Sequence, residues 1–359
     1  MAKLKKILIM AGGTGGHVFP GLAVAVQLRE QGVEVHWLGT QNGFEARVVP
    51  QEGIPLHFIT ISGLRGKGLK DSLLMPIRLF KAIVQAIRVM KKIRPDVVLG
   101  MGGFVSGPGG IASWLLRIPL VIHEQNAKAG MTNKWLAKVA TTVLEGFPNT
   151  FSNVMNVFFT GNPVRDAIAN IPVPEGHFQE KSEALRLLVV GGSLGAAVIN
   201  QLIPRTLSKM PAEERPVVYH QTGEKNLQAT LEAYQSANVK AEVVPFIEDM
   251  ANAYSWADIV LCRAGALTIA ELCAAGRGAI LVPYPHAVDD HQTKNANYLV
   301  ANKAAILIQQ KDLTEDVLIS IFKQQALVNN CLAMANAAYS LRKVDATRNV
   351  LKFCEEAAL

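Results

Sequence analysis

The sequence has few cysteines, few aromatic residues and few charges. Its 359 residues include four cysteines, at positions 262, 273, 331 and 354, and none of them forms a C-x-x-C pair. This spacing argues against a zinc site or a disulfide framework and favours a reducing compartment. Aromatic residues make up 6% of the chain and charged residues 18%, whereas hydrophobic residues make up 50%. Such a composition excludes wholesale disorder and provides enough apolar material for packed cores.

Long uninterrupted apolar runs are also scarce. Residues 97–116 carry no charge and are long enough to cross a bilayer, but six of them are glycine. We therefore expect a strand, a tight loop and a helix start there, not a transmembrane helix. The basic N-terminus is followed by only a short apolar stretch, which we expect to be the first strand and not a signal peptide.

Two fingerprints of nucleotide-binding folds are missing as well. Counted from Gly13, the dinucleotide motif G-x-G-x-x-G fails because Val18 stands at the third glycine, and the P-loop motif G-x-x-x-x-G-K-[ST] does not occur.

The chain does contain one sequence pattern that occurs twice. An apolar run at 7–10 leads into Gly12-Gly13-Thr14-Gly15-Gly16, and another at 187–190 leads into Gly191-Gly192-Ser193. A short apolar run followed by a Gly-rich turn is typical of a buried parallel strand that precedes a helix. Further strand-like runs alternate with helical stretches in both halves. We therefore predict an α/β protein of two doubly wound, Rossmann-like domains, with parallel sheets that face each other across a cleft.

The domain boundary is expected in the stretch 161–181, which is rich in proline and has little hydrophobic periodicity. This places an N-terminal domain at 1–163 and a C-terminal domain at 164–340. Residues 341–359 are expected to form a helix that packs back on the N-terminal domain.

Polar and small residues gather where predicted strands end. Three Gly-rich loops, the third at 100–103, favour phosphate binding over a mere packing role, because backbone N–H groups at a helix start attract anions. The polar cluster 123–126 follows a buried strand, and the small residues of 263–271 open a helix whose start could hold a diphosphate. The adjacent Asp289 and Asp290 are interpreted as solvated and not as a metal site.

The basic charge of the chain is concentrated in residues 63–94, which hold nine Lys/Arg and one acidic residue, Asp71. The spacing predicts a helix whose core face carries Leu73, Ile77, Phe80, Val84 and Ile87, with a second apolar row (Met75, Leu79, Ile83, Met90) partly off that face. A basic helix with spare apolar surface indicates binding to an anionic membrane surface, and a solvated cationic helix is the alternative. Nucleic acid is not expected as a partner, because the segment lacks interleaved aromatics and any recognisable binding module.

Eight segments together resemble the MurG family of bacterial N-acetylglucosaminyltransferases. They are GGTGGHVFP, GMGGFVSGPGG, HEQNAKAGMTNKWLAK, TGNPVR, VVGGSLGA, HQTG, PFIEDM and RAGALTIAEL, in the order found in the family, and the match covers about residues 6 to 300.

The resemblance implies the GT-B fold and an inverting transfer of N-acetylglucosamine from UDP-N-acetylglucosamine to the 4-hydroxyl of the N-acetylmuramoyl group of lipid I, which yields lipid II. It implies no metal and no cofactor. It further implies a peripheral location at the cytoplasmic face of the bacterial inner membrane, with other cell-wall synthesis proteins as further partners.

The resemblance also implies roles for single residues. Thr14, Gly15 and Gly16 would line the acceptor side near the donor sugar, with Asn126 in contact with that sugar. The donor site would be formed by Arg165, Ser193 and Gln292, by Ile247 at the uracil, by Glu271 at the ribose, and by the helix start of Ala266, Leu267, Thr268, Ile269 and Ala270 at the diphosphate. Two departures are Leu194, where the family usually has Gln, and Phe104, where it usually has Tyr.

The chemistry requires a base for the acceptor hydroxyl, and histidine is suited to this near neutral pH. His17, in the first Gly-rich loop, is the candidate by position, Glu124 is the alternative base, and a helix-capping histidine is the structural alternative for His17. Two other function classes are considered. The basic apolar helix argues against a UDP-sugar 2-epimerase with the same architecture, and three Gly-rich loops that converge with His and Glu argue against a non-catalytic anion-binding scaffold.

Overall fold

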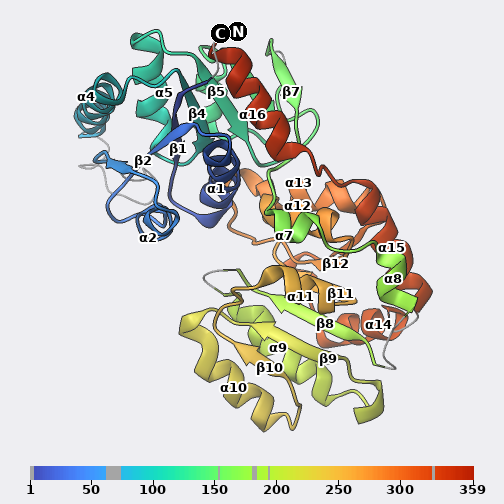
Figure 1. Cartoon of the computed structure of the whole chain (residues 1–359). Helices are drawn as coiled ribbons and strands as arrows, with labels where there is room; N and C mark the ends of the chain where they lie inside the picture. Colours follow the sequence, from blue (N-terminus) through green and yellow to red (C-terminus); the bar gives the residue numbers. More distant parts are fainter. Residues whose placement is uncertain (1–3, 62–73, 153, 180–183, 193–194, 326–327) are drawn as a thin grey trace. The chain divides into compact units, whose positions relative to one another are not determined.

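The chain forms two compact units in a computed structural model, which describes residues 4–61, 74–152, 154–179, 184–192, 195–325 and 328–359 (Figure 1). Unit 1 comprises Met1–Arg165 and Val344–Leu359, and unit 2 comprises Asp166–Lys343. Each unit holds a parallel sheet flanked by helices, so the predicted α/β class with two doubly wound domains is confirmed.

The sheet of unit 1 reverses its strand order next to β1. In spatial order its strands are β3 (Leu56–Phe58), β2 (Glu34–Gly39), β1 (Lys6–Ala11), β4 (Val97–Gly102), β5 (Leu120–Glu124), β6 (Thr142–Glu145) and β7 (Val157–Phe159). Ile9 of β1 lies opposite Trp37 of β2 on one side and Leu99 of β4 on the other, all in parallel register. Open α/β sheets bind ligands beyond the carboxyl ends of the strands at such a reversal. In unit 1 that position is occupied by the first and third Gly-rich loops.

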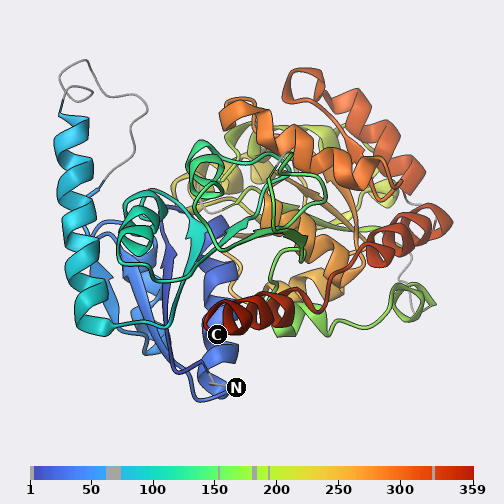
Figure 2. The same cartoon turned by 90° about the horizontal axis from the view of Figure 1, so that it is seen from above.

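Helices cover both faces of this sheet. They are α1 (Gly15–Glu30), α2 (Glu45–Val48), α4 (Met75–Ile93), α5 (Ser106–Leu115), α6 (Met131–Leu136) and α16 (Ala346–Ala357). The apolar side chains of α1 and α16 share one core with the strands, and those of α4 and α5 share the other. Figure 2 shows α4, in cyan, and α16, in dark red, on opposite sides of the strands.

Helix α4 buries a different face from the one predicted. Its fully buried side chains include Ala82, Ala86 and Met90, whereas Ile77 and Phe80 are 66% and 68% exposed. The predicted core face was therefore wrong at Ile77 and Phe80, whereas Ile87 of that face packs against the core. The expected spacing weighted the large apolar residues, but the small alanines let the helix backbone approach its neighbours closely, so that the larger side chains face outward. Leu73 lies outside the described residues.

Unit 2 repeats the same plan. Its strands, in spatial order, are β10 (Glu242–Val244), β9 (Val217–Gln221), β8 (Arg186–Val190), β11 (Ile259–Cys262), β12 (Gly278–Leu281) and β13 (Ala305–Leu307). Its helices are α7 (Asp166–Ala169), α8 (Pro174–Gln179), α9 (Ala197–Ser208), α10 (Leu227–Ser236), α11 (Met250–Trp256), α12 (Ala266–Ala275), α13 (His291–Val300), α14 (Glu315–Gln325) and α15 (Val328–Ser340). The order reverses between β8 and β11, and α12 begins directly beyond β11.

The uncharged stretch 97–116 forms β4, a Gly-rich loop and α5, as the sequence predicted. Within the described ranges, no helix combines the length and apolarity that crossing a membrane requires.

Candidate functional site

His17 is positioned by the two Gly-rich loops of unit 1. It lies in the first turn of α1, where its backbone N–H donates to Thr14 O at 3.1 Å. Its ring packs against Gly102 at the end of β4, which has a φ of 103°. A Cβ at this position would lie 2.6 Å from His17 Nδ1. Glycine is therefore required at 102 both for its backbone conformation and to leave space for the ring.

Gln125 determines which nitrogen of the neutral His17 ring carries the proton. Its Oε1 lies 2.9 Å from His17 Nδ1, and a carbonyl oxygen can only accept a hydrogen bond. In the neutral ring the proton is therefore on Nδ1, and Nε2 is the nitrogen that can take up a second proton. The side chain of His17 thus bonds across to another loop, in place of the helix-capping role considered from the sequence.

The orientation of the Gln125 amide follows from its other partner, His123. Gln125 Nε2 lies 3.1 Å from His123 Nδ1 and also donates to His123 O at 3.3 Å. Burial lowers the pKa of His123 to about 4, so this ring is neutral near pH 7. Its proton is on Nε2, which donates to Gly161 O at 3.0 Å. The side chains of His123, Gln125 and His17 thus form one continuous chain of hydrogen bonds.

Glu124, the alternative base, is enclosed by donors. Its Oε1 accepts from the backbone N–H and side-chain amide of Asn126 at 3.0 and 3.1 Å. Its Oε2 accepts from Gly130 N at 3.0 Å and from Asn133 Nδ2 at 2.9 Å. This buried carboxylate holds the loop after β5 in shape, and Asn126 is tied to that loop through it.

The other predicted residues of unit 1 lie at the same edge of its sheet. Thr14 and Gly16 are exposed and Gly15 is half-buried in the loop that begins α1. The Arg165 guanidinium lies over the ring of Phe19 from α1, with 5.6 Å between Cζ and the ring centroid.

Five of the donor residues predicted in unit 2 form the start of α12. This helix begins at Ala266 after Gly265, and the first N–H groups of a helix have no acceptor within it. Ala266 and Ile269 are buried, whereas Leu267, Thr268 and Ala270 are partly exposed. The start of α12 can therefore offer backbone donors to an anion.

Glu271 lies one turn further along α12 and is 6% exposed. Its Oε2 accepts a hydrogen bond from Tyr254 Oη of α11 at 3.1 Å. Ile247 is buried just before α11, and Gln292, in the first turn of α13, accepts from Tyr284 N at 2.9 Å. Ser193 and Leu194 lie outside the described residues.

The role of Gln125 was missed from the sequence, although its neighbours Glu124 and Asn126 were selected. Gln125 and His17 are 108 residues apart along the chain, and no local spacing links them. The available signal was indirect: two polar clusters each follow a strand of one parallel sheet. No group of three or more His, Cys, Asp or Glu side chains suited to a metal ion occurs in the part of the chain that the structure describes.

Family models cover most of the chain. The sequence matches the glycosyltransferase family 28 N-terminal domain over residues 7–145 and the C-terminal domain of the same family over residues 186–350. It is 57% identical over 355 residues to the UDP-N-acetylglucosamine--N-acetylmuramyl-(pentapeptide) pyrophosphoryl-undecaprenol N-acetylglucosamine transferase of Marinobacter nauticus, with 99% of this chain and 98% of that protein covered. The protein of the same name from Hahella chejuensis is 52% identical, with 98% of each chain covered.

The comparison with solved structures supports the same family. MurG of Acinetobacter baumannii is similar to this chain with a TM-score of 0.83 and 42% identity, covering 98% of this chain and 99% of that one. A UDP-N-acetylglucosamine 2-epimerase has a TM-score of 0.67 at 14% identity, covering 97% and 95%. At that identity the epimerase is similar in fold alone.

Proposed function

Since the chain belongs to the MurG family of glycosyltransferases, we propose that it synthesises lipid II. The reaction transfers N-acetylglucosamine from UDP-N-acetylglucosamine to the 4-hydroxyl of the N-acetylmuramoyl group of lipid I. Unit 1 binds the acceptor and unit 2 binds the nucleotide sugar. Family membership also identifies the two-unit architecture as the GT-B fold.

Family membership supports the choice of substrates, and the single structural observation that carries the proposed chemistry is the chain of hydrogen bonds from His123 through Gln125 to His17. Attack on the anomeric carbon requires removal of a proton from the acceptor hydroxyl. In the neutral tautomer with the proton on Nδ1, His17 Nε2 can accept it, and Gln125 Oε1 stabilises the Nδ1–H of the resulting imidazolium. A single displacement by this hydroxyl inverts the anomeric centre.

His17 is preferred to Glu124 as the base because of their partners. Each oxygen of Glu124 already accepts two hydrogen bonds, so proton uptake there would break at least one of them. Glu124 stays the alternative base if His17 proves dispensable.

The departing UDP is held by unit 2. The backbone N–H groups at the start of α12 oppose the charge that grows on the diphosphate, and they do so without a metal ion. Glu271 accepts from the ribose hydroxyls, the backbone at Ile247 meets the uracil, and Gln292 contacts the sugar. The family resemblance also assigns Ser193 and Arg165 to the donor, and Asn126, Thr14, Gly15 and Gly16 to the reacting sugar.

We further propose that unit 1 docks on an anionic membrane surface through α4 and its neighbours. Ile77 and Phe80 are exposed on α4 beside the exposed Lys81. Trp114 of the adjoining α5 and Trp135 of α6 are 55% and 65% exposed. Exposed aromatic and aliphatic side chains flanked by basic ones suit peripheral binding at the face of the membrane that carries the lipid-linked acceptor. The remaining part of the basic segment, residues 63–73, lies outside the described residues.

The direct test is transfer of radiolabelled N-acetylglucosamine to a short-chain lipid I analogue, with and without a chelator. We expect transfer in both conditions and a product of inverted anomeric configuration by NMR. Conversion of UDP-N-acetylglucosamine without acceptor would instead indicate an epimerase.

Two variants divide the proposed roles. His17→Ala should lower turnover by at least about a hundredfold, the contribution typical of a general base, with little change in the Kd for UDP-N-acetylglucosamine. Glu271→Ala should weaken UDP binding in calorimetry by about 1.5–3 kcal/mol, the value of a hydrogen bond to a charged group. Near-normal turnover of His17→Ala would transfer the role of base to Glu124, and unchanged UDP affinity of Glu271→Ala would refute the ribose contact.

A further inference from the structure

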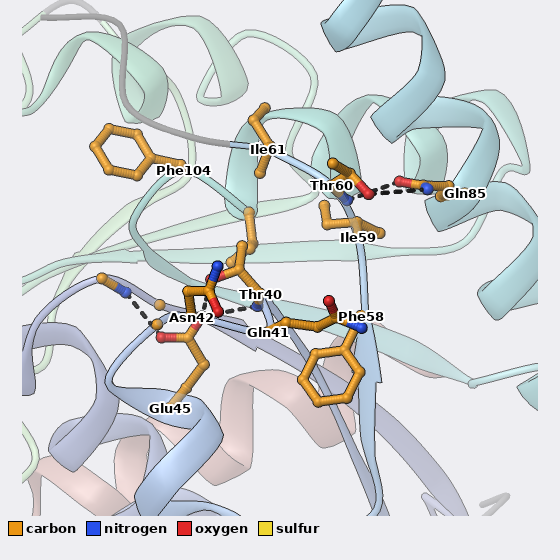
Figure 3. A pocket seen from close by; sticks show the side chains of 14 residues that line it. Thr40, Gln41, Asn42, Glu45, Phe58, Ile59, Thr60, Ile61, Gln85 and Phe104 are labelled. Carbon is orange, nitrogen blue, oxygen red and sulfur yellow. Dashed lines mark hydrogen bonds between the residues drawn. The ribbon is translucent and has the colours of Figure 1, made fainter.

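Unit 1 contains a pocket of about 510 Å³ at the carboxyl ends of β1 to β4, beside the His17 loop (Figure 3). We propose that this pocket binds the peptide arm of the lipid-linked acceptor. The proposal rests on the proposed function, because it assigns a subsite for one part of that substrate. The volume of the pocket lies within the range of about 300–1,000 Å³ that is usual for ligand sites.

Among the described residues that line the pocket, the one charged side chain is the carboxylate of Glu45. Glu45 is fully buried and accepts from Gly13 N at 3.0 Å and from Thr40 N and Thr40 Oγ1 at 2.8 Å each. The Gly13 N–H, which could have met an anion, is thus used by this carboxylate. No Lys or Arg is found among the described residues that line the pocket.

The position of Glu45 is built into the backbone around it. A Cβ on Gly12, Gly39 or Gly43 would come within 2.2 to 2.7 Å of an atom of the Glu45 side chain. Three glycines thus make room for one buried carboxylate, which ties the loop after β2 to the loop that carries His17. The pocket and the proposed base are consequently held in one framework.

The other side chains that line the pocket have the hydrogen-bonding and apolar groups that a peptide ligand requires. The side-chain amides of Gln41 and Asn42 project from the loop after β2 and make no hydrogen bond to any part of the protein that the structure describes. An amide can donate to a peptide carbonyl and accept from a peptide N–H, which is the pairing that a peptide backbone needs. Phe58 and Phe104, 43% and 54% exposed, lie on either side of these polar groups in Figure 3 and offer apolar contacts to aliphatic side chains.

The covalent structure of the acceptor brings its peptide to this place. In an N-acetylmuramoyl group the lactyl ether that carries the peptide is on the carbon next to the 4-hydroxyl, whereas the diphosphate is attached across the ring. With the 4-hydroxyl at His17, the peptide must leave the sugar close to the His17 loop. Gly12 and Gly13 belong both to that loop and to the lining of the pocket. Phe104, another lining residue, is two positions after Gly102, against which the His17 ring packs.

The test compares two short-chain acceptors, one with the full pentapeptide and one that ends at the lactyl group. The wild-type protein should prefer the first, measured as a ratio of kcat/KM values. In the double variant Gln41→Ala, Asn42→Ala this ratio should fall roughly tenfold, since hydrogen bonds from two amides are lost. Gln51→Ala, which removes an exposed amide of the same unit outside the pocket, should keep the wild-type ratio.

A binding measurement separates this inference from the proposed function. Calorimetry should detect a soluble N-acetylmuramoyl-pentapeptide, without diphosphate or lipid, on the wild-type protein, and weaker binding on the double variant. Transfer to both acceptors with an unaltered ratio in the double variant would overturn the peptide subsite while leaving the proposed function intact. Peptide binding without transfer to either acceptor would support the subsite and refute the proposed function.

Discussion

At the scale of single residues, the candidate base depends on a glycine as much as on the histidine itself. Gly102 combines a left-handed φ with direct contact to the His17 ring, so any side chain there would strain the backbone and displace the ring. Gly32 also has a left-handed φ, of 82°, but a Cβ added there would meet no atom within 4 Å. An alanine at Gly32 would strain the backbone only, whereas an alanine at Gly102 would also displace the His17 ring. Comparing the two variants therefore distinguishes the effect of backbone strain from the effect of moving the histidine.

Gly102→Ala is expected to lower turnover by about a hundredfold, the cost of misplacing a reacting group by about 1 Å, with little change in UDP binding. Gly32→Ala should cost about 1–2 kcal/mol of stability, the penalty of a left-handed alanine, and retain wild-type turnover. Steady-state kinetics together with urea unfolding check both. Equal turnover in the two variants would show that the placement of His17 against Gly102 is immaterial to the reaction.

The buried histidines make stability depend on pH in a defined direction. His123 has a pKa of about 4 when folded, against about 6.5 in the unfolded chain, because burial penalises its charged form. Between these values the unfolded chain binds a proton that the folded chain does not. The stabilising contribution is therefore complete above pH 6.5 and is lost as the pH falls toward 4. Burial lowers the pKa of His220 in unit 2 to about 3, with the same sign.

From about pH 7.5 to about pH 5, His123 alone should reduce the free energy of unfolding by about 2 kcal/mol. Urea unfolding at both pH values measures the change. His123→Asn is expected to be less stable at pH 7.5 but to lose less on acidification, so the readout is the difference between the two pH values. An equal pH dependence in parent and variant would mean that His123 does not take up a proton on unfolding.

At the scale of elements, α4 shows how packing buries some apolar side chains of a basic amphipathic helix and leaves others exposed. Its buried face is built from Ala82, Ala86, Met90 and Ile93, and Ile77 and Phe80 lie outside it. Hydrophobic spacing correctly predicted a basic amphipathic helix. It could not predict which apolar row would be buried, because that depends on how closely the neighbouring helix and sheet approach.

Replacing the exposed Lys81, Arg88 and Lys91 by Gln should weaken binding to vesicles with anionic lipid by about 1 kcal/mol per charge. Added salt should mimic the effect, because exposed charges are screened over about 8 Å at physiological ionic strength. Ile77→Ser with Phe80→Ser should weaken binding with little salt dependence. Vesicle flotation at two salt concentrations provides the measurement.

The matched control replaces three exposed lysines of unit 2 by Gln, namely Lys225, Lys240 and Lys303. This control has the same net charge as the α4 triple variant. Equal loss of flotation in both would assign the effect to overall charge and not to α4.

At the scale of the whole molecule, the chain completes unit 1 only at its end. After unit 2 it returns through α16, whose Val350, Leu351 and Cys354 are buried in the core that α1 and the sheet of unit 1 share. Unit 2, by contrast, is one continuous stretch of chain. The last helix therefore stabilises strands that precede it by more than two hundred residues.

Leu351→Ala should lower the stability of unit 1 by about 2–5 kcal/mol, because a buried leucine is lost from its core. Hydrogen exchange should accelerate in β1 to β6 and remain unchanged in β8 to β12. Lys352→Ala, on the exposed side of the same helix, is the control and should leave both units unaffected. Equal acceleration in both units would show that they unfold as one cooperative body.

The sequence by itself determined the architecture, and it placed the candidate site residues at the ends of strands. Continuous apolar runs followed by Gly-rich turns indicate buried parallel strands, and this signal is local, so it was read correctly in both units. The same reasoning placed His17, the 123–126 cluster and the start of α12 at strand ends, where open α/β sheets bind ligands.

Tertiary structure alone decided how those groups meet. The contact of Gln125 with His17, the enclosure of Glu45 by Gly12, Gly39 and Gly43, and the burial of Ala82 in α4 each join segments distant along the chain or depend on close backbone approach. Local periodicity shows which residues share a face of an element, but it does not contain the identity of the element packed against that face. Those long-range contacts set the tautomer of the proposed base and the shape of the pocket beside it.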